Sequence, residues 1–212
     1  MDTRLAFPGN ELSRTNARRH TITEGITRTY RPRIAECDRV FIVGKTGSGK
    51  TYWASHMLGS RDDVVVLDSL WRIDRSSGMF SRAKIIRSVD DFARFCEANF
   101  QRGGFIVYLD ELLELVEENK ELFIKLCTRG RAQGIGMWYS TQRPRGIPRV
   151  GLSEAEHYVI FTLTLADDRK FMYEQVGRDE ILAKPVDIYG YWYYDVKRDR
   201  LVYSSGLRIA KT

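Results

Sequence analysis

The sequence predicts an α/β fold with three layers, in which helices cover both faces of a central, mostly parallel β-sheet, followed by a C-terminal β-hairpin. Two observations predict it. Short apolar runs rich in β-branched residues alternate with stretches of helical periodicity along most of the chain, a pattern typical of right-handed βαβ units. Near the C-terminus, two aromatic and apolar runs are separated only by a short polar link, which is typical of a hairpin.

Five apolar runs are expected to form the strands of the sheet, because each is short and bounded by glycine or polar residues, as buried parallel strands usually are. They comprise residues 40–43, 64–67, 106–109, 137–140 and 158–163. The helices are expected over residues 50–58, 89–98 and 114–133. Ser88 is a candidate N-cap for the second helix, and Gly134 is placed to end the third. The hairpin is expected to join residues 189–196 to residues 201–204.

Residues 1–37 differ in composition from the rest of the chain. They are polar, rich in arginine and threonine and weakly patterned, so we expect an N-terminal arm there and one domain over residues 38–212. With 43% hydrophobic residues the chain is too apolar for a disordered protein. No apolar run approaches the roughly 20 residues that span a bilayer, so no transmembrane segment is expected. The three scattered cysteines favour a reducing compartment over a disulfide framework.

Residues 44–51 match the phosphate-loop pattern G-x-x-x-x-G-K-[ST] between a predicted strand and a predicted helix. Glycines let such a loop curl so that backbone N–H groups point at phosphate oxygens, and the following helix adds the positive end of its dipole. Lys50 is expected to reach the β- and γ-phosphates, and the Thr51 hydroxyl to bind Mg²⁺. The expected nucleotide-binding residues are Gly44, Lys45, Thr46, Gly47, Ser48, Gly49, Lys50 and Thr51.

Two adjacent carboxylates, Asp110 and Glu111, follow the strand expected at residues 106–109. Asp110 is expected to hold Mg²⁺ through water, and Glu111 is a candidate general base that accepts a proton from the attacking water. The structural alternative is a charge pair at a helix N-terminus. The carboxylate pair favours ATP hydrolysis, and the sequence has no N-K-x-D segment of the kind that reads guanine in a GTPase.

Gln142 ends the next predicted strand, within the segment Ser-Thr-Gln-Arg-Pro at residues 140–144. This strand is expected to lie beside the one that carries Asp110. Gln142 is then placed to hydrogen-bond the γ-phosphate or the attacking water and to report which nucleotide is bound. The alternative is a strand-end glutamine that satisfies the backbone of its own loop.

These motifs, with the segment Arg-Gly-Arg-Ala-Gln-Gly-Ile-Gly at residues 129–136 that leads into the 140–144 strand end, resemble the FtsK/HerA superfamily of DNA-pumping ATPases. The resemblance extends from residue 38 to about residue 205. It implies a RecA-like P-loop NTPase fold, ATP and Mg²⁺ as cofactors, and double-stranded DNA as a partner that is bound without sequence preference.

Within that superfamily, a chain this short is most similar to the genome-packaging ATPases of tailless icosahedral viruses with an internal membrane. The resemblance implies an ATPase that drives the viral genome into a preformed capsid as a homo-oligomeric ring, a pentamer or a hexamer. It further implies docking on a protein of the capsid vertex or of the virion membrane. The expected location is the cytoplasm of the infected host cell or the packaging vertex of the virion.

Two arginines near the end of the third predicted helix are candidates for an arginine finger. Arg131 falls where the superfamily places the finger that enters the neighbouring subunit's site, and Arg129 is the second candidate. Such a guanidinium stabilises the charge that develops on the γ-phosphate, whereas the alternative is that both arginines complement the helix dipole. The resemblance also covers Asp68, an acidic residue after the second predicted strand, without assigning it a role.

The basic excess of the chain is formally located in one segment. With 34 Lys and Arg against 28 Asp and Glu, the formal charge is +6. Residues 122–153 contain no acidic residue, and without their six basic residues the remainder of the chain is neutral: Lys125, Arg129, Arg131, Arg143, Arg145 and Arg149. Arg145 and Arg149, in the loop over residues 143–150, are candidates for sequence-independent contacts to DNA phosphates. A solvated loop is the alternative.

Two questions keep alternatives open. The aromatic residues of the predicted hairpin are candidates for stacking on adenine or on DNA bases, although such hairpins more often pack against their own domain. They are Tyr189, Tyr191, Trp192, Tyr193 and Tyr194.

The alternative function is another FtsK/HerA-type DNA pump or a phage-assembly ATPase. A small-molecule nucleotide kinase is less favoured, because the adjacent carboxylates Asp110 and Glu111 fit hydrolysis better.

Overall fold

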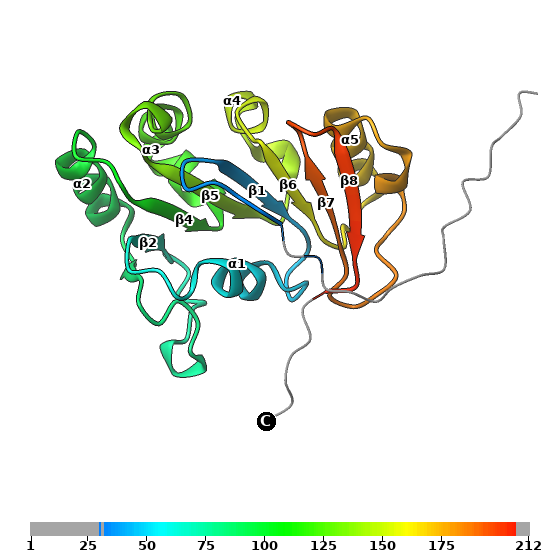
Figure 1. Cartoon of the computed structure of the whole chain (residues 1–212), viewed down its shortest axis with the longest axis horizontal. Helices are drawn as coiled ribbons and strands as arrows, with labels where there is room; N and C mark the ends of the chain where they lie inside the picture. Colours follow the sequence, from blue (N-terminus) through cyan, green and yellow to red (C-terminus); the bar gives the residue numbers. More distant parts are fainter. Residues whose placement is uncertain (1–29, 31, 207–212) are drawn as a thin grey trace, which may run out of the picture.

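The computed structural model describes residue 30 and residues 32–206. Most of the arm predicted at residues 1–37 therefore lies outside the described residues, and the domain boundary stays a prediction. The described part consists of a central β-sheet with helices on both faces (Figure 1). The predicted three-layer α/β fold is confirmed.

The sheet of the described part has eight strands in the order β3-β2-β4-β5-β1-β6-β7-β8. The strands from β3 to β6 in this order pair in parallel, and β7 and β8 pair antiparallel at one edge as the predicted hairpin. The bounds are β1 Arg39–Val43, β2 Val64–Leu67, β3 Lys84–Ile86, β4 Ile106–Asp110, β5 Gly136–Thr141, β6 His157–Ile160, β7 Tyr191–Asp195 and β8 Arg200–Ser204.

Helices α2, α3, α4 and α5 lie on one face of the sheet and α1 on the other (Figure 1). Their bounds are α1 Lys50–Leu58, α2 Val89–Asn99, α3 Leu112–Arg129, α4 Arg149–Ser153 and α5 Ala166–Val176. Two apolar cores follow from this arrangement. One includes Phe92, Phe123 and Met172 of α2, α3 and α5, and the other includes Trp53 of α1 stacked on Trp138 of β5. The central strands therefore bury both faces, as their continuous apolar runs predict.

Helix α3 differs from the single helix predicted over residues 114–133. The backbone leaves helical geometry at Asn119, whose side-chain Oδ1 accepts a hydrogen bond from the Leu122 N–H at 3.0 Å and so acts as an internal N-cap. After α3 ends, a separate 3-10 turn covers Arg131–Gln133, and Gly134, with φ 69°, closes that turn. Gly134 thus acts as a C-cap, as predicted, but it ends the short 3-10 turn and not the helix.

The strand predicted at residues 158–163 is too long, since β6 stops at Ile160. Its neighbour β1 turns away after Val43 into the phosphate loop, so regular pairing ends there. Two backbone hydrogen bonds continue beyond the end of β6. The Phe161 N–H donates to the Val43 carbonyl at 2.8 Å, and the Lys45 N–H donates to the Thr162 carbonyl at 2.9 Å. The end of β6 thus anchors the start of the loop.

Three elements, β3, α4 and α5, escape prediction from the sequence. β3 has three residues and α4 has five, too few for a period to show. α5 is longer, but only Asp168, Met172 and Val176 of its residues are buried, so its apolar stripe is narrow. The N-cap prediction is confirmed, since the Ser88 side chain accepts a hydrogen bond from the Asp91 N–H at the start of α2. In the part of the chain that the structure describes, no helix has the length and apolarity to cross a membrane.

Candidate nucleotide-binding site

Three neighbouring strands carry the predicted motifs at their carboxyl ends, which lie along one side of the sheet and are called the site edge. β5 lies between β4 and β1, and the parallel register brings the carboxyl ends of the three strands level with one another. The residues that follow are Gly44 after β1, Glu111 after β4 and Gln142 after β5. In open parallel sheets ligands bind at this edge, so the fold gathers residues that are distant in sequence into one candidate site.

The phosphate loop has the backbone that its glycines predict. Gly47 and Gly49 have φ values of 73° and 101°, in the region that favours glycine. At Gly44 a side chain has no room, since a Cβ atom there would lie 2.6 Å from the Phe161 Cβ and 2.7 Å from the Ser48 Oγ. The loop therefore curls tightly at the N-terminus of α1, where the first backbone N–H groups have no intrahelical acceptors and can bind an anion.

Lys50 is nearly buried, with 7% of its surface exposed. Its Nζ donates to the carbonyl oxygens of Gly44 at 2.7 Å and Lys45 at 3.2 Å. Burial lowers the pKa of Lys50, and the nearby carboxylates of Glu111 and Asp110 oppose that shift. The ammonium is thus held inside the loop, where phosphate oxygens can take the place of the two carbonyls as acceptors.

Thr51 and Asp110, the predicted Mg²⁺ ligands, are in direct contact. The Thr51 hydroxyl donates to Asp110 Oδ1 at 2.7 Å, and the buried Tyr108 hydroxyl donates to the same oxygen at 2.7 Å. Burial, together with the Asp110 charge, raises the pKa of Tyr108 well above its usual range, so Tyr108 remains a donor. Asp110 Oδ2 is buried and has no hydrogen-bond partner among the described residues. A buried carboxylate oxygen beside a threonine hydroxyl fits a hard cation such as Mg²⁺.

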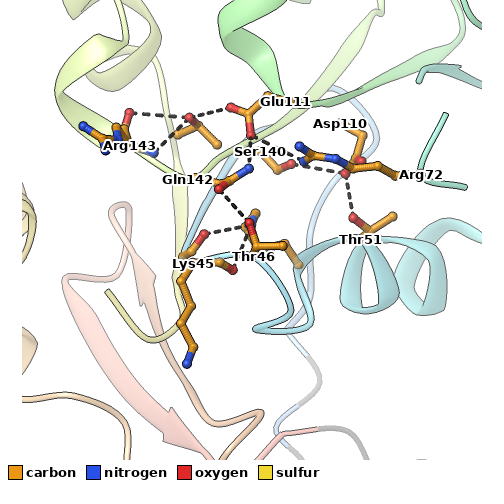
Figure 2. A network of polar contacts seen from close by, with 12 residues as sticks. Lys45, Thr46, Thr51, Arg72, Asp110, Glu111, Ser140, Gln142 and Arg143 are labelled. Carbon is orange, nitrogen blue, oxygen red and sulfur yellow. Dashed lines mark hydrogen bonds and ion pairs between the residues drawn. The ribbon is translucent and has the colours of Figure 1, made fainter. Parts of the chain in front are cut away.

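Gln142 joins the phosphate loop to Glu111 (Figure 2). Its Oε1 accepts from the Thr46 hydroxyl at 2.7 Å, and its Nε2 donates to Glu111 Oε2 at 3.1 Å. The Thr141 hydroxyl donates to the other oxygen, Glu111 Oε1, at 2.9 Å. Glu111 has φ 81°, which is uncommon for a residue with a side chain. The predicted sensor and the predicted base are therefore hydrogen-bonded to each other.

A further loop, which the sequence motifs do not include, brings a positive charge to the site. Arg72 follows β2, and its Nη1 lies 3.6 Å from Glu111 Oε2. Asp68, whose role the sequence leaves open, is fully buried and accepts from the backbone N–H groups of Arg72 at 2.8 Å and Ile73 at 3.1 Å. In the sequence, Asp68 was the only residue of this segment that indicated a functional role. The proximity of Arg72 to Glu111 becomes visible only in the folded chain.

The two candidate arginine fingers lie at the opposite edge of the sheet from the phosphate loop. Both precede β5, whose length of six residues corresponds to about 20 Å. Arg131 forms an ion pair with Glu156, which directly precedes β6. Arg129 is exposed and makes no ion pair within the described residues. A finger role for either arginine would therefore act on a neighbouring subunit, and the assignment stays a prediction.

Most of the hairpin aromatics are packed within the fold. Tyr191, Tyr193 and Tyr194 are buried in the sheet, so for these three the packed alternative is correct and stacking on a base is not. Tyr189 differs, because it precedes β7, is 41% exposed and lies beside the phosphate loop. A Cβ atom on Gly49 would lie 3.4 Å from Tyr189 Cδ1. Tyr189 is the hairpin aromatic that is placed to contact a nucleotide base.

The basic loop begins after β5, at the end of the sheet that carries the site, and runs into α4. The Arg145 guanidinium contacts α5, where it donates to the Asp167 carbonyl at 3.5 Å and lies 5.9 Å from the Phe171 ring centre. Arg149 begins α4 and is exposed. Both side chains are at the surface, and their contact to DNA stays a prediction.

Comparisons with known proteins agree with this geometry. Neither a protein-family model nor a curated protein sequence matches the chain. Among solved structures, the genome-packaging NTPase B204 of Sulfolobus turreted icosahedral virus 2, in complex with AMPPCP, matches with a TM-score of 0.67 and 16% identity over 82% of this chain and 100% of that chain. The DNA-packaging ATPase B204 of Sulfolobus turreted icosahedral virus matches with a TM-score of 0.65 and 17% identity over the same shares.

The pCW3 conjugation coupling protein TcpA also matches, with a TM-score of 0.63 and 13% identity over 80% of this chain and 60% of that chain. The chain therefore shares the P-loop NTPase fold of these structures. The predicted RecA-like fold is thereby confirmed. The roles of Lys50, Asp110, Glu111 and Gln142 remain predictions that rest on the geometry described above.

Replacing Glu111 with glutamine tests the general base. Glu111→Gln should bind ATP but hydrolyse it about 10²- to 10⁴-fold more slowly, because an amide keeps the shape of the side chain but cannot accept the proton. Single-turnover hydrolysis and a fluorescence titration of nucleotide binding measure the two effects separately. Glu117→Gln, an exposed position of α3, is the matched control. Wild-type turnover in Glu111→Gln would show that another group is the base.

Tyr189→Ala tests contact with the nucleotide base. The substitution should weaken ATP binding about 10-fold or more, since stacking of one base on an aromatic ring contributes about 1–3 kcal/mol. Tyr189→Phe keeps the ring and should bind ATP like the wild type. Inorganic tripolyphosphate, which has no base, should compete equally well for all three proteins. An equal loss of tripolyphosphate binding in Tyr189→Ala would instead indicate a damaged phosphate loop.

Proposed function

We propose that this chain is a Mg²⁺-dependent ATPase that translocates double-stranded DNA without sequence preference and packages a viral genome into a preformed capsid. The observation that carries the proposal is the convergence of Lys50, Thr51, Asp110, Glu111 and Gln142 at one edge of an FtsK/HerA-type fold. Together they supply the parts that ATP hydrolysis requires, namely a phosphate cradle, a metal site, a base and a sensor.

Each of these residues has a distinct part in hydrolysis. When bound, ATP would supply the γ-phosphoryl group and Mg²⁺ would neutralise the charge on its oxygens. Lys50 would donate to phosphate oxygens from inside the loop, and Asp110 and Thr51 would hold the metal ion. Glu111 accepts the proton of the attacking water. Gln142, which is hydrogen-bonded to Glu111, orients that water or the γ-phosphate and links the loop to the base.

The packaging role is supported by how completely the structures correspond. The match covers 100% of the packaging NTPase B204, but 60% of TcpA and 26% of the type VII secretion ATPase EccC of Thermomonospora curvata. The fold of B204 thus has a counterpart in this chain over its whole length, and this correspondence supports the packaging proposal.

We further propose that the active form is a homo-oligomeric ring. Arg129 and Arg131 lie at the sheet edge opposite their own phosphate loop, so a finger from this edge completes a site only across a subunit boundary. A head-to-tail contact of this kind closes into a ring. The ring would dock on a capsid vertex protein or a virion membrane protein, either in the cytoplasm of the infected host cell or on the virion.

DNA-stimulated hydrolysis tests the proposed function. Phosphate release should rise when double-stranded DNA of any sequence is added, and the stimulation should decline between about 50 and 200 mM salt, because phosphate contacts compete with counterions. An Arg145→Ala/Arg149→Ala double variant should lose most of the stimulation, whereas Arg102→Ala, an exposed change elsewhere, should not. Turnover that ignores DNA but depends on a nucleoside or nucleotide acceptor would identify a kinase instead.

Mixing two inactive variants tests the finger across the subunit boundary. Lys50→Ala lacks the phosphate lysine, and Arg129→Ala or Arg131→Ala lacks one candidate finger, a loss of about 10³- to 10⁵-fold if that arginine acts. In randomly mixed rings, roughly a quarter of the interfaces combine an intact site with an intact finger. Activity should therefore return on mixing for the arginine that acts. Native mass spectrometry confirms mixed rings, and failure to regain activity in such rings would exclude a finger from these positions.

A further inference from the structure

The loop after β2 is built around one buried carboxylate. Asp68 is fully buried and accepts the backbone N–H groups of Arg72 and Ile73, while its own carbonyl accepts the Trp71 N–H at 3.2 Å. Ile73 is buried in the apolar core on the α1 face. We call residues 68–73 the Asp68 turn. Its hydrogen bonds determine where the backbone of Arg72 lies relative to the site.

A second arginine braces the Asp68 turn from outside. Arg87 follows β3, and its Nη1 lies 3.4 Å from Asp68 Oδ2 while its guanidinium lies 4.0 Å from the centre of the Trp71 ring. Trp71 has φ 55°, a conformation that residues with side chains seldom adopt and that persists only where the surroundings impose it. The turn is thus a constrained element, although Trp71 itself is 71% exposed.

This constrained turn presents Arg72 to the candidate base. Arg72 Nη1 lies 3.6 Å from Glu111 Oε2, an ion-pair distance that is too long for a good hydrogen bond. The same Glu111 oxygen accepts from Gln142, and the other accepts from Thr141. Each Glu111 carboxylate oxygen therefore accepts a hydrogen bond, and Oε2 also faces the Arg72 guanidinium.

Arg72 also lies near the phosphate loop. Its positive charge is felt at Lys50, where it disfavours the ammonium form, and its side chain is 38% exposed and so has room to change rotamer. Figure 2 shows Arg72 reaching into the network that contains Glu111, Gln142 and Thr46. A triphosphate on the loop would place oxygens with more negative charge than one carboxylate close to this guanidinium, and guanidinium groups bind phosphates in a bidentate manner.

We propose that Arg72 senses the γ-phosphate: it pairs with Glu111 until ATP binds, and then moves to the γ-phosphate oxygens. Glu111 then loses its cationic partner, while Gln142 and Thr141 still hold the carboxylate in position to act as the base. The inference rests on the proposed ATPase function and adds a residue to it. Asp68 acts as a positioning residue, because it orients the turn without touching the nucleotide. ADP, which has no γ-phosphate, leaves Arg72 paired with Glu111. Hydrolysis is thereby confined to a site that holds a triphosphate.

The test compares the affinities for a non-hydrolysable ATP analogue and for ADP. Arg72→Ala should weaken binding of the analogue about 10- to 100-fold, as expected when a hydrogen bond to a charged group is lost, and should leave ADP binding nearly unchanged. Asp68→Asn should show a smaller loss of the same kind. Arg82→Ala is the matched control, since Arg82 is exposed and donates only to the Ser60 carbonyl in the described structure. Fluorescence titration measures each affinity.

A double-variant cycle separates sensing from a structural effect. Glu111→Gln removes the negative partner of Arg72, so this variant should bind the ATP analogue more tightly than the wild type. That gain should disappear in Glu111→Gln/Arg72→Ala. A structural role predicts instead that Arg72→Ala weakens ADP and the analogue equally, and that the cycle is additive.

The possible failures are distinguishable. If wild-type protein binds neither ATP analogue nor ADP, the proposed ATPase function is wrong and the sensor role is wrong with it. If wild-type protein binds both, but Arg72→Ala changes neither affinity or changes both equally, the sensor role alone is overturned. Thermal unfolding of each variant checks that the protein is still folded after the substitution.

Discussion

The parallel register of β4, β5 and β1 is the constraint on which the candidate site depends. Because β5 pairs with both neighbours up to its last residues, the turns after the three strands lie at one level. This arrangement allows Gln142 to bond Thr46 on one side and Glu111 on the other. A slip of one residue in β5 would send the Gln142 side chain to the opposite face of the sheet, and the link between loop and base would be lost.

Burial adds a second requirement, since a charge removed from water must find a partner. Lys50 donates to loop carbonyls, and Asp110 accepts from three hydroxyl groups. Glu111 is contacted by Gln142, Thr141 and Arg72. These partners hold the charged groups close to the positions that nucleotide chemistry needs. The same contacts are ones that phosphate oxygens and a cation can replace, so stability of the site and its proposed function use the same atoms.

The basic excess is divided between two edges of the sheet. In the segment 122–153, Arg129 and Arg131 lie where β5 begins, whereas Arg145 and Arg149 follow its end. The two groups are separated by the length of β5, about 20 Å. Arg129 and Arg131 are therefore remote from their own phosphate loop, whereas Arg145 and Arg149 are exposed and Arg145 contacts α5. The arginines of one sequence segment therefore lie in two separate places in the fold, before and after β5.

Local patterns in the sequence were enough to predict the phosphate loop at residues 44–51, the carboxylates Asp110 and Glu111, and Gln142 at a strand end. Short or weakly amphipathic elements such as β3, α4 and α5 carried too little periodicity to be predicted. The folded chain was needed to reveal that Arg72 faces Glu111 and that Tyr189 lies against Gly49. These pairs are separated by long stretches of chain, and their proximity comes from sheet order and loop packing, which no local pattern records.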